Sequence, residues 1–319
     1  MIGVPNSVSV IVCGYTLERW SSLIAAVRSL GAQSLRPDEV VVVIDHNPEL
    51  LRRARARLPG ELPDIRIVAN EGRRGLSGAR NTGVTVSHGE IVVFLDDDAV
   101  AHADWMERLV APYDDPAVMV TGGLCLPDWE TGRPWWFPAE FDWVVGCSYR
   151  GLPEQMGEVR NPIGAAMSMR RTALAHAGVF REDFGRVGTT PLGCEETEMA
   201  IRIRQHDNRA LIVHVPSAVV THAVPAGRGR LRYFLSRCQA EGFSKAQVVR
   251  SVGAGDGLGS ERAYVCRVLP SGVLNGLRRA ACGDCAGLGR AAMIVTGLTL
   301  TTLGFLRGSL RGEPVAAPR

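Results

Sequence analysis

The sequence predicts an α/β fold with a mostly parallel central sheet and a mainly helical C-terminal extension. Over residues 8–95, short β-branched runs alternate with stretches whose apolar residues recur at helical spacing, a pattern typical of βαβ units. Polar residues follow the ends of several of these runs, at the edge where open α/β sheets bind ligands. The C-terminal part is apolar, rich in glycine and flanked by arginine, which favours helices over strands.

The predicted strands are short apolar runs bounded by turn or polar residues. The run at Val8–Val12 follows Pro5 and Asn6, and Glu39–Ile44 reads E-V-V-V-V-I before Asp45, so both are predicted to be buried strands. The full set of predicted strands is Val8–Val12, Glu39–Ile44, Ile65–Val68, Glu90–Leu95, Ala117–Gly123, Ala165–Met169 and Ala210–Val215.

The predicted helices show apolar residues three and four positions apart. In Leu17–Leu30 the apolar spacing is regular and Gly31 ends the helix. The other predicted helices are Glu49–Leu58, Gly75–Val86, His102–Ala111, Arg170–Ala177, Glu195–His206 and Arg230–Arg250. Residues 126–162 are rich in Pro, Trp and Gly without periodicity, and we interpret them as a substrate-binding loop region.

Composition indicates a soluble globular protein with a sizeable core. The chain has 319 residues, is 46% hydrophobic and 22% charged, and carries a formal net charge of +3, which gives no reason to expect nucleic acid as a partner. The eight cysteines are scattered, and no histidines at ligand spacing accompany Cys282 and Cys285. We therefore expect reduced thiols and a cytoplasmic protein without a secretory signal.

The C-terminal region predicts contact with a membrane surface. We divide the chain into an α/β domain, 1–250, and a helical basic and apolar extension, 251–319. Within the extension, Ala291–Leu306 holds no charged residue, but its sixteen residues fall short of the roughly twenty that span a bilayer. A buried core helix, a monotopic insertion and a tilted span all stay open. Arginines surround the stretch, so we rank peripheral association with the inner face of the plasma membrane first.

The run I-V-V-F-L-D-D-D (91–98) places three carboxylates at the end of a buried strand. Adjacent carboxylates repel one another unless solvent or a cation offsets their charge. A hard divalent cation held there can neutralise a diphosphate, whereas the alternative is a solvated turn. A D-x-D pattern alone does not decide between the two.

The order of the motifs along the chain carries more information than any one of them. A first strand and helix, a second strand ending in Asp45, the segment A-N-E-G-R-R-G-L-S-G-A-R-N-T-G (69–83) and then F-L-D-D-D follow in sequence. Over residues 7–245 this set resembles family 2 glycosyltransferases of the GT-A fold, a nucleotide-binding α/β sheet. The resemblance implies a nucleotide-sugar donor, with a UDP-sugar favoured, and a Mg²⁺ or Mn²⁺ cofactor.

The resemblance assigns two residues to the nucleotide base. Tyr15 is expected to stack near the base, and Asp45 matches the acid that accepts a hydrogen bond from it. The chain departs from the family pattern close by, because Cys13 and Gly14 replace the usual Pro and Thr, and His46 follows Asp45 where a second acid is common.

The resemblance also assigns the diphosphate and metal side of the site. Gly75 and Arg80 match the family's N-x-G…A-R-N-x-G segment, where Arg80 is expected to reach a phosphate or the pyrimidine edge. Asp96 and Asp97 are expected on the nucleotide side, and Asp96 and Asp98 at the metal.

The run G-C-E-E-T-E (193–198) matches the family pattern that holds the catalytic base. Glu196 is the expected base and Glu195 the second candidate, although a Glu at this position departs from the more common Asp. From spacing alone, an acidic helix N-terminus stabilised by the helix dipole explains the run equally well.

Four further residues are assigned by resemblance. His222, in V-V-T-H-A-V, is expected just after a strand, where relatives place a late metal or diphosphate contact, and a structural histidine is the alternative. Arg160, in R-N-P-I-G-A-A-M, and Arg237 with Lys245, in R-C-Q-A-E-G-F-S-K, match segments of relatives that act on lipid phosphates, most similarly the glucosyl-dolichyl-phosphate glucuronosyltransferase group. Arg160, Arg237 and Lys245 are expected on the acceptor or diphosphate side. For Arg237 and Lys245, which lie in a predicted helix, the alternative is that they belong to a solvated helix face.

The sequence thus predicts an inverting, metal-dependent hexosyltransferase that moves a sugar from a nucleotide-diphosphate sugar to a sugar or lipid-linked acceptor. Transfer to a soluble small-molecule or natural-product acceptor is the first alternative. A sugar nucleotidyltransferase would carry a Gly-rich phosphate loop after the first strand, where this chain has C-G-Y-T-L-E-R-W. A non-catalytic nucleotide-sugar-binding protein is the remaining alternative, and the acid triplet together with Glu196 speaks against it.

Overall fold

The computed structural model describes residues 7–186, 193–253, 255 and 261–310. The chain forms two compact units: unit 1 comprises Met1–Leu126, Pro153–Thr189 and Glu195–His222, and unit 2 comprises Pro127–Leu152, Thr190–Cys194 and Ala223–Arg319. Each is described by itself. The boundary that the sequence suggests at residue 250 stays a prediction.

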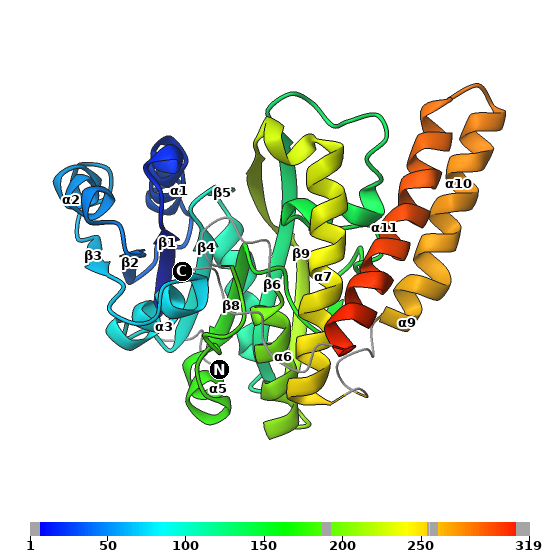
Figure 1. Cartoon of the computed structure of the whole chain (residues 1–319). Coiled ribbons are helices and arrows are strands. Elements are labelled where there is room, and N and C mark those ends of the chain that lie inside the picture. The colour runs from blue at the N-terminus through cyan, green and yellow to red at the C-terminus, as the bar shows by residue number, and fades with distance from the viewer. Residues whose placement is uncertain (1–6, 187–192, 254, 256–260, 311–319) are drawn as a thin grey trace. The chain divides into compact units, whose positions relative to one another are not determined.

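Unit 1 is built on a sheet whose first half is parallel. The strands β1 (Val8–Gly14), β2 (Glu39–Ile44), β3 (Arg66–Ala69) and β4 (Ile91–Asp96) lie in the order β3-β2-β1-β4 (Figure 1). All three of their pairings are parallel, with Val10 opposite both Val40 and Val93. Their carboxyl ends therefore meet at one edge, as expected of the α/β class.

The second half of the sheet continues with antiparallel pairings. These strands are β5 (Ala99–Ala101), β6 (Val118–Trp129), β7 (Gly157–Glu158), β8 (Ala166–Arg170) and β9 (Leu211–Val224), and the order runs β4-β8-β6-β9-β5 with β7 beside β9. The pairs β4–β8, β6–β8, β5–β9 and β7–β9 are antiparallel. The predicted α/β class, with its parallel strands and helical C-terminal region, is confirmed.

Strands β5, β7 and β9 differ from the sequence prediction, and β7 falls in the stretch 126–162 that the sequence predicts to be loop. The strand predicted at Ala210–Val215 is the beginning of β9, which runs on through Pro216 to Val224, so His222 lies inside a strand and not after one. Proline is tolerated where the ladder does not need its N–H. The short strand β5 was not predicted, because its residues A-V-A give no strand signal of their own.

The helices of unit 1 follow the predicted positions closely. They are α1 (Trp20–Gly31), α2 (Pro48–Arg57), α3 (Leu76–Val86), α4 (Trp105–Val110), α5 (Arg171–Ala177) and α6 (Glu195–His206). Strands β1, β2 and β4 are buried almost end to end, which explains their continuous Val- and Ile-rich sequences. Helix α3 packs closely on β1, since a Cβ at Gly83 would lie 2.5 Å from Ile11 Cγ2.

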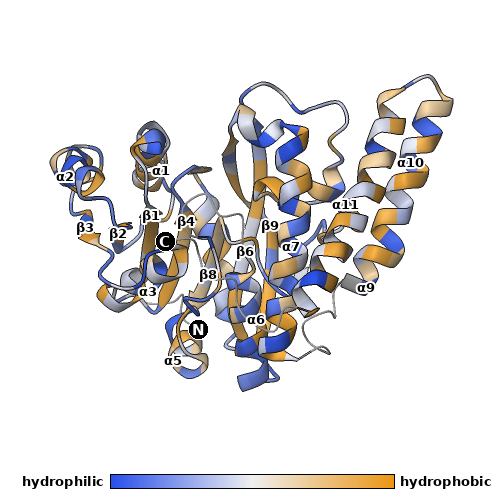
Figure 2. Ribbon diagram, viewed as in Figure 1, coloured by the Kyte–Doolittle hydropathy of each residue, from blue (hydrophilic) through white to orange (hydrophobic). Residues whose placement is uncertain are grey.

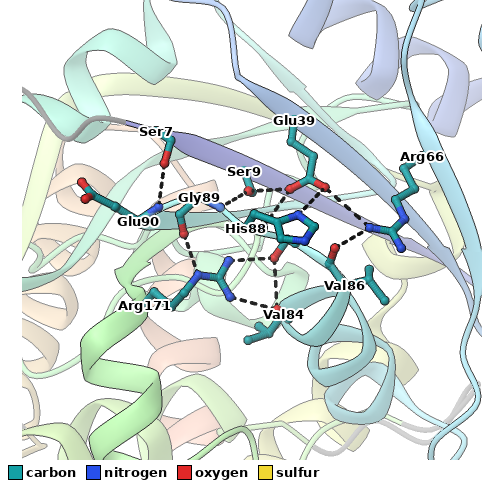
Figure 3. A network of polar contacts seen from close by, with 11 residues as sticks. Ser7, Ser9, Glu39, Arg66, Val84, Val86, His88, Gly89, Glu90 and Arg171 are labelled. Atoms are coloured by element: carbon teal, nitrogen blue, oxygen red, sulfur yellow. Dashed lines mark hydrogen bonds and ion pairs between the residues drawn. The ribbon is translucent and has the colours of Figure 1, made fainter.

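A polar network closes the amino-terminal edge of this sheet (Figure 3). The Glu39 carboxylate accepts hydrogen bonds from Ser9 Oγ at 2.8 Å and from the backbone N–H of His88 at 3.0 Å. Ser9 Oγ in turn accepts from the N–H of Gly89 at 2.7 Å, and Arg171 donates to the carbonyl of Gly89 at 2.7 Å. The network thereby fastens β1, β2, the loop after α3 and the start of α5 to one another.

Unit 2 is mainly helical. Its elements include η4 (Ala139–Val145), α7 (Leu231–Val252), α9 (Glu261–Ala263), the π-helical turn η6 (Tyr264–Val268), α10 (Leu269–Ala281) and α11 (Ala286–Leu310). Figure 1 shows α10 and α11 side by side as a hairpin next to α7. All eight cysteines of the chain are free thiols, as expected.

Candidate active site

The candidate active site lies at the carboxyl edge of the parallel strands. Tyr15 follows β1, Asp45 follows β2, and Asp96 is the last residue of β4. Because β1 lies between β2 and β4, these side chains come from three adjacent strands. The polar residues that the sequence marked at strand ends are therefore gathered at one edge.

Three of the predicted residues form a group with metal-ligand geometry. One ligand atom each of Asp96, Asp98 and His222 lies within 4.8 Å of the other two. Strand pairing explains the meeting, because His222 of β9 is opposite Ala99 of β5, the residue after Asp98. His222 Nε2 lies 3.1 Å from Asp98 Oδ1, and both side chains are buried, whereas the Asp96 side chain is 29% exposed. Two carboxylates and an imidazole fit a divalent metal such as Mg²⁺ or Mn²⁺.

Arg19 is a member of the site that the sequence prediction missed. Its Nη1 lies 2.8 Å from Asp97 Oδ1 and 3.0 Å from Asp98 Oδ2, and its guanidinium lies 5.4 Å from the centre of the Tyr15 ring. Burial and the neighbouring Asp98 charge raise the pKa of Asp97 to about 7, although Arg19 opposes the shift. The sequence signal that could have identified Arg19 is its position four residues after Tyr15, a distance of about one helical turn.

Asp45 organises the loop before α3. Its Oδ1 accepts a hydrogen bond from Asn70 Nδ2 at 2.7 Å, and its Oδ2 accepts from the N–H of Gly75 at 3.0 Å. Gly75 has φ of 132°, a conformation that favours glycine, and is the N-cap of α3. Asp45 thus fixes the entry to α3 in addition to any contact with a nucleotide.

Arg80 is buried and committed to protein partners. From α3, its Nη1 lies 3.0 Å from Glu195 Oε1, while its Nη2 lies 3.4 Å from Asp96 Oδ1 and donates to the carbonyl of Gly164 at 2.9 Å. Burial by itself would lower the pKa of Arg80, but the nearby Glu195 and Asp96 charges outweigh it. Arg80 joins α6, β4 and the loop before β8, so we interpret it as a residue that positions the site.

The three glutamates at the start of α6 have different surroundings. Glu195 is buried against Arg80, and Glu198 is buried in an ion pair with Arg202 at 2.8 Å. Glu196 is only half-buried, accepts a hydrogen bond from Thr197 Oγ1 at 3.3 Å, and has its Cγ 3.8 Å from where a Cβ of Gly164 would lie. The same Cβ would lie 3.4 Å from Arg80 Nη2, so Glu196 and Arg80 are both close to Gly164.

The residues predicted on the acceptor side fall in different parts of the molecule. Arg160 lies in unit 1, and its Nε donates to Asn161 Oδ1 at 3.0 Å. Arg237 lies on α7 in unit 2, where it is buried, pairs with Glu241 at 2.9 Å and has its guanidinium 5.8 Å from the Trp143 ring. Burial would raise the pKa of Glu241, but the charges of Arg237 and Lys245 hold it below its usual range.

A half-parallel sheet with carboxylates and a metal-ligand group at its carboxyl edge agrees with the GT-A fold of the solved structures to which the chain is similar. The model of the family described as glycosyl transferase family 2 matches residues 9–178, which is more than half of the chain. The chain belongs to this family and is a glycosyltransferase.

Two kinds of relative illustrate the family. The chain is 36% identical over 239 residues to the glucosyl-dolichyl phosphate glucuronosyltransferase of Haloferax volcanii, an alignment that covers 75% of this chain and 76% of that protein. It is 27% identical over 257 residues to polypeptide N-acetylgalactosaminyltransferase 12 of Mus musculus, with coverage of 75% of this chain and 43% of that protein.

Solved structures agree on the fold. A mannosyltransferase of Pyrobaculum calidifontis in complex with GDP-Man and Mn²⁺ superposes with a TM-score of 0.56 at 20% identity, over 93% of this chain and 86% of that chain. GalNAc-T7 with UDP, GalNAc and Mn²⁺ superposes with a TM-score of 0.53 at 18% identity, over 82% of this chain and 54% of that chain. At these identities the likeness concerns the fold alone.

Proposed function

We propose that this glycosyltransferase moves a sugar from a UDP-sugar to the hydroxyl of a lipid-phosphate-linked acceptor, with inversion at the anomeric carbon. The observation that carries the proposal is the group Asp96, Asp98 and His222, together with the half-buried Glu196 beside Gly164. The name of the Haloferax volcanii relative supports a glycosylated lipid phosphate as the acceptor class.

In the proposed reaction, Asp96, Asp98 and His222 would hold the divalent cation, which would supply positive charge against the diphosphate leaving group. Two carboxylates suit Mg²⁺ or Mn²⁺, and the imidazole favours Mn²⁺ of these two. Tyr15 and Asp45 hold the base, and Gly75 opens α3 towards the phosphates. Glu196 accepts the proton from the acceptor hydroxyl while that oxygen attacks the anomeric carbon in line.

The buried residues around Glu196 support its assignment as the base. Glu195 is bound to Arg80 and Glu198 to Arg202, so both are already neutralised by a guanidinium. Glu196 is the more accessible of the three. A general base must reach the proton that it takes, and accessibility comes before pKa in deciding which carboxylate does so.

Arg160, Arg237 and Lys245 are proposed as acceptor or diphosphate contacts. Arg237 and Lys245 lie on the same helix as Glu241, so their two positive charges exceed the one negative charge beside them. The excess suits an anionic group such as a lipid phosphate.

A donor and acceptor screen with the full chain tests the proposal. Purified protein is given Mn²⁺ or Mg²⁺ and a panel of UDP- and GDP-sugars, with and without glycosylated polyprenyl phosphate, and nucleotide release is measured with and without EDTA. We expect release from one UDP-sugar that requires both the metal and the lipid-linked acceptor. The anomeric configuration of the product, read by NMR, reports inversion.

Each other outcome has a definite meaning. If a soluble sugar acceptor accelerated nucleotide release and the lipid-linked acceptor did not, the proposed acceptor class would be overturned. Selection of a GDP-sugar would overturn the donor. Folded protein that neither binds nor turns over any nucleotide sugar in the presence of metal would overturn the proposal as a whole.

A further inference from the structure

Helix α11 of unit 2 has its small residues on the inside and its large apolar residues on the outside. Its buried positions are Gly287, Ala291, Ile294, Gly297, Gly304 and Gly308. Its exposed large apolar side chains are Leu288, Val295, Leu303, Leu306 and Leu310. A helix at the surface of a water-soluble domain normally turns its large apolar residues inward, so the outer face of α11 suits a medium other than water.

The inner face of α11 is held by protein along its length. A Cβ at Gly287 would lie 2.3 Å from the carbonyl oxygen of Gly276 in α10, and one at Gly304 would lie 2.1 Å from that of Gln239 in α7. Near the middle of the helix, a Cβ at Gly297 would lie 2.4 Å from a ring carbon of Phe141. By length and composition α11 could cross a membrane, but a spanning helix meets lipid on most sides, whereas one side of α11 is packed against unit 2.

The outer face of α11 forms a continuous apolar strip, which we call the outer strip. Leu288, Val295 and Leu306 are 57%, 55% and 52% exposed, and residues 291–306 carry no charge. Three of the threonine hydroxyls on α11 are satisfied within the helix. The hydroxyls of Thr296, Thr299 and Thr302 each donate to the carbonyl four residues earlier at 2.9 Å. A hydroxyl bonded in this way costs little in an apolar medium.

Neighbouring parts of unit 2 also expose apolar side chains. In α10, Leu274 and Leu277 are 54% and 45% exposed, and Figure 2 shows apolar residues along both helices of the hairpin. Trp135 is 64% exposed and packs on Gly289, at the same end of α11 as Arg290. An exposed tryptophan beside an arginine is typical of the membrane–water interface.

The charge of the hairpin is positive. Residues 261–310 contain six arginines and two acidic residues, and one of the acids, Asp284, is paired with Arg279 at 2.9 Å and with Arg290 at 2.7 Å. Arg290 and Arg307 flank the uncharged part of α11. Positive charge at the ends of an apolar strip is complementary to an anionic lipid surface.

We propose that the α10–α11 hairpin anchors the protein in the plane of an anionic membrane. The outer strip of α11 enters the boundary between headgroups and acyl chains to a depth of about 5–10 Å, and the arginines lie among the headgroups. The proposal rests on unit 2 alone. It deepens the proposed function, since a lipid-linked acceptor is met at such a surface.

Flotation of the full chain with lipid vesicles, without donor or metal, tests the anchor. We expect strong binding to vesicles of phosphatidylcholine mixed with phosphatidylglycerol and much weaker binding to phosphatidylcholine alone. The double variant Val295→Asp/Leu303→Asp should bind at least about tenfold more weakly, because two charges in the apolar region oppose insertion. Arg278→Gln and Arg307→Gln should each weaken binding to the anionic vesicles about fivefold.

Two controls separate loss of the anchor from loss of the fold. Met156, in unit 1, is 64% exposed, so Met156→Asp introduces a charge at an equally exposed apolar site and should bind vesicles like the unchanged protein. The unfolding temperature of every variant should stay close to that of the unchanged protein, because the substituted side chains are exposed.

The orientation is tested by labelling with a membrane-impermeant maleimide. In a first variant, Cys266 and Cys282 are changed to Ser, so that Cys285 reports the beginning of α11. In a second variant, Cys285 is also changed to Ser and Ser309 is changed to Cys, so that residue 309 reports the end of the helix. Both ends should be labelled from outside sealed vesicles. Protection of one end would show a spanning helix and overturn the in-plane anchor.

Absence of binding by folded protein would overturn the membrane proposal. A dimer in solution that Val295→Asp/Leu303→Asp converts to monomers, together with no vesicle binding, would instead assign the outer strip to a second copy of the chain. Intact vesicle binding with no glycosyl transfer would refute the proposed function and leave the anchor standing.

Discussion

The carboxylates at the two edges of the sheet in unit 1 have pKa values that are shifted in opposite directions. At the amino-terminal edge, Glu39 accepts hydrogen bonds from Ser9 and from the N–H of His88 (Figure 3). Burial would raise the pKa of Glu39, but these donors outweigh it and hold the pKa below its usual range. At the carboxyl edge, burial and the neighbouring Asp98 raise the pKa of Asp97 to about 7 even though Arg19 is in contact with both aspartates.

The contrast shows where the molecule uses charge for stability and where it keeps charge for a ligand. A carboxylate surrounded by donors stabilises the fold and has little capacity left for a cation. Crowded carboxylates cost stability by themselves, and a bound cation offsets that cost. Substitutions of the crowded aspartates at the carboxyl edge should therefore affect activity more than stability, and substitution of Glu39 at the amino-terminal edge should do the reverse.

The largest effect at the carboxyl edge is expected from Glu196→Gln. The amide keeps the shape of the side chain but cannot accept the acceptor proton, so kcat should fall by about 10²–10⁴-fold. Donor affinity and unfolding temperature should not change. Steady-state kinetics and calorimetry measure these quantities.

The matched control is Glu198→Gln, two residues further along α6. It breaks the buried pair with Arg202 and should lower the free energy of unfolding by about 1–3 kcal/mol while kcat is retained. If Glu198→Gln abolished turnover and Glu196→Gln did not, the base would be misassigned.

Arg80→Met should be the most destabilising single change at the carboxyl edge. It leaves Glu195 buried without its guanidinium partner, at a cost of roughly 3–5 kcal/mol in the free energy of unfolding, measured by urea denaturation. The double variant Arg80→Met/Glu195→Gln should recover part of the loss, because the second change removes the stranded charge. No recovery would mean that the pair is not the source of the effect.

Asp98→Asn should separate metal binding from stability. We expect metal-dependent nucleotide release to fall by about 10²–10³-fold, with loss of Mn²⁺ binding in EPR titrations. The unfolding temperature should stay the same or rise, since one of two adjacent buried charges is removed. Unchanged Mn²⁺ affinity in this variant would remove Asp98 from the metal site.

Glu39→Gln tests the amino-terminal edge and should lower stability by a small amount without lowering activity. Glu39 is partly exposed, with its side chain at 21%, so we expect a loss of about 1–2 kcal/mol in the free energy of unfolding. Activity at saturating donor and acceptor should not change. A loss of kcat without a loss of stability would erase the distinction between the two edges.

The pH dependence of stability sharpens the same comparison. The pKa of Glu39 is lower in the folded protein than its ordinary value of 4.5, so its contribution to stability is present above that pH and is lost as the pH falls through the folded pKa. The stability difference between the unchanged protein and Glu39→Gln should therefore shrink as the pH falls below about 4.5. A difference that stays constant down to strongly acidic pH would show that the ionised carboxylate is not what stabilises this edge.

Much of unit 1 could be predicted from sequence because buried parallel strands have a strong local signal. The continuous apolar runs at β1, β2 and β4 predicted buried strands, and the polar residues at their ends predicted the edge of the sheet at which the site lies. The spacing of apolar residues predicts which positions are buried, however, and does not predict which side chains lie opposite them. It could not distinguish Glu195, Glu196 and Glu198, which differ in which guanidinium lies opposite each one.

The sequence by itself determined the α/β class, the order of the site motifs and the presence of an apolar C-terminal stretch, since each depends on residues close together in the chain. Tertiary structure decided what depends on distant segments. Pairing of β5 with β9 brings His222 to Asp98, and the first turn after β1 brings Arg19 to the aspartates. For α11 the sequence left three alternatives open. Packing against α7 and α10 decided that one face is buried and one exposed, because only the partners of a helix define its inner side.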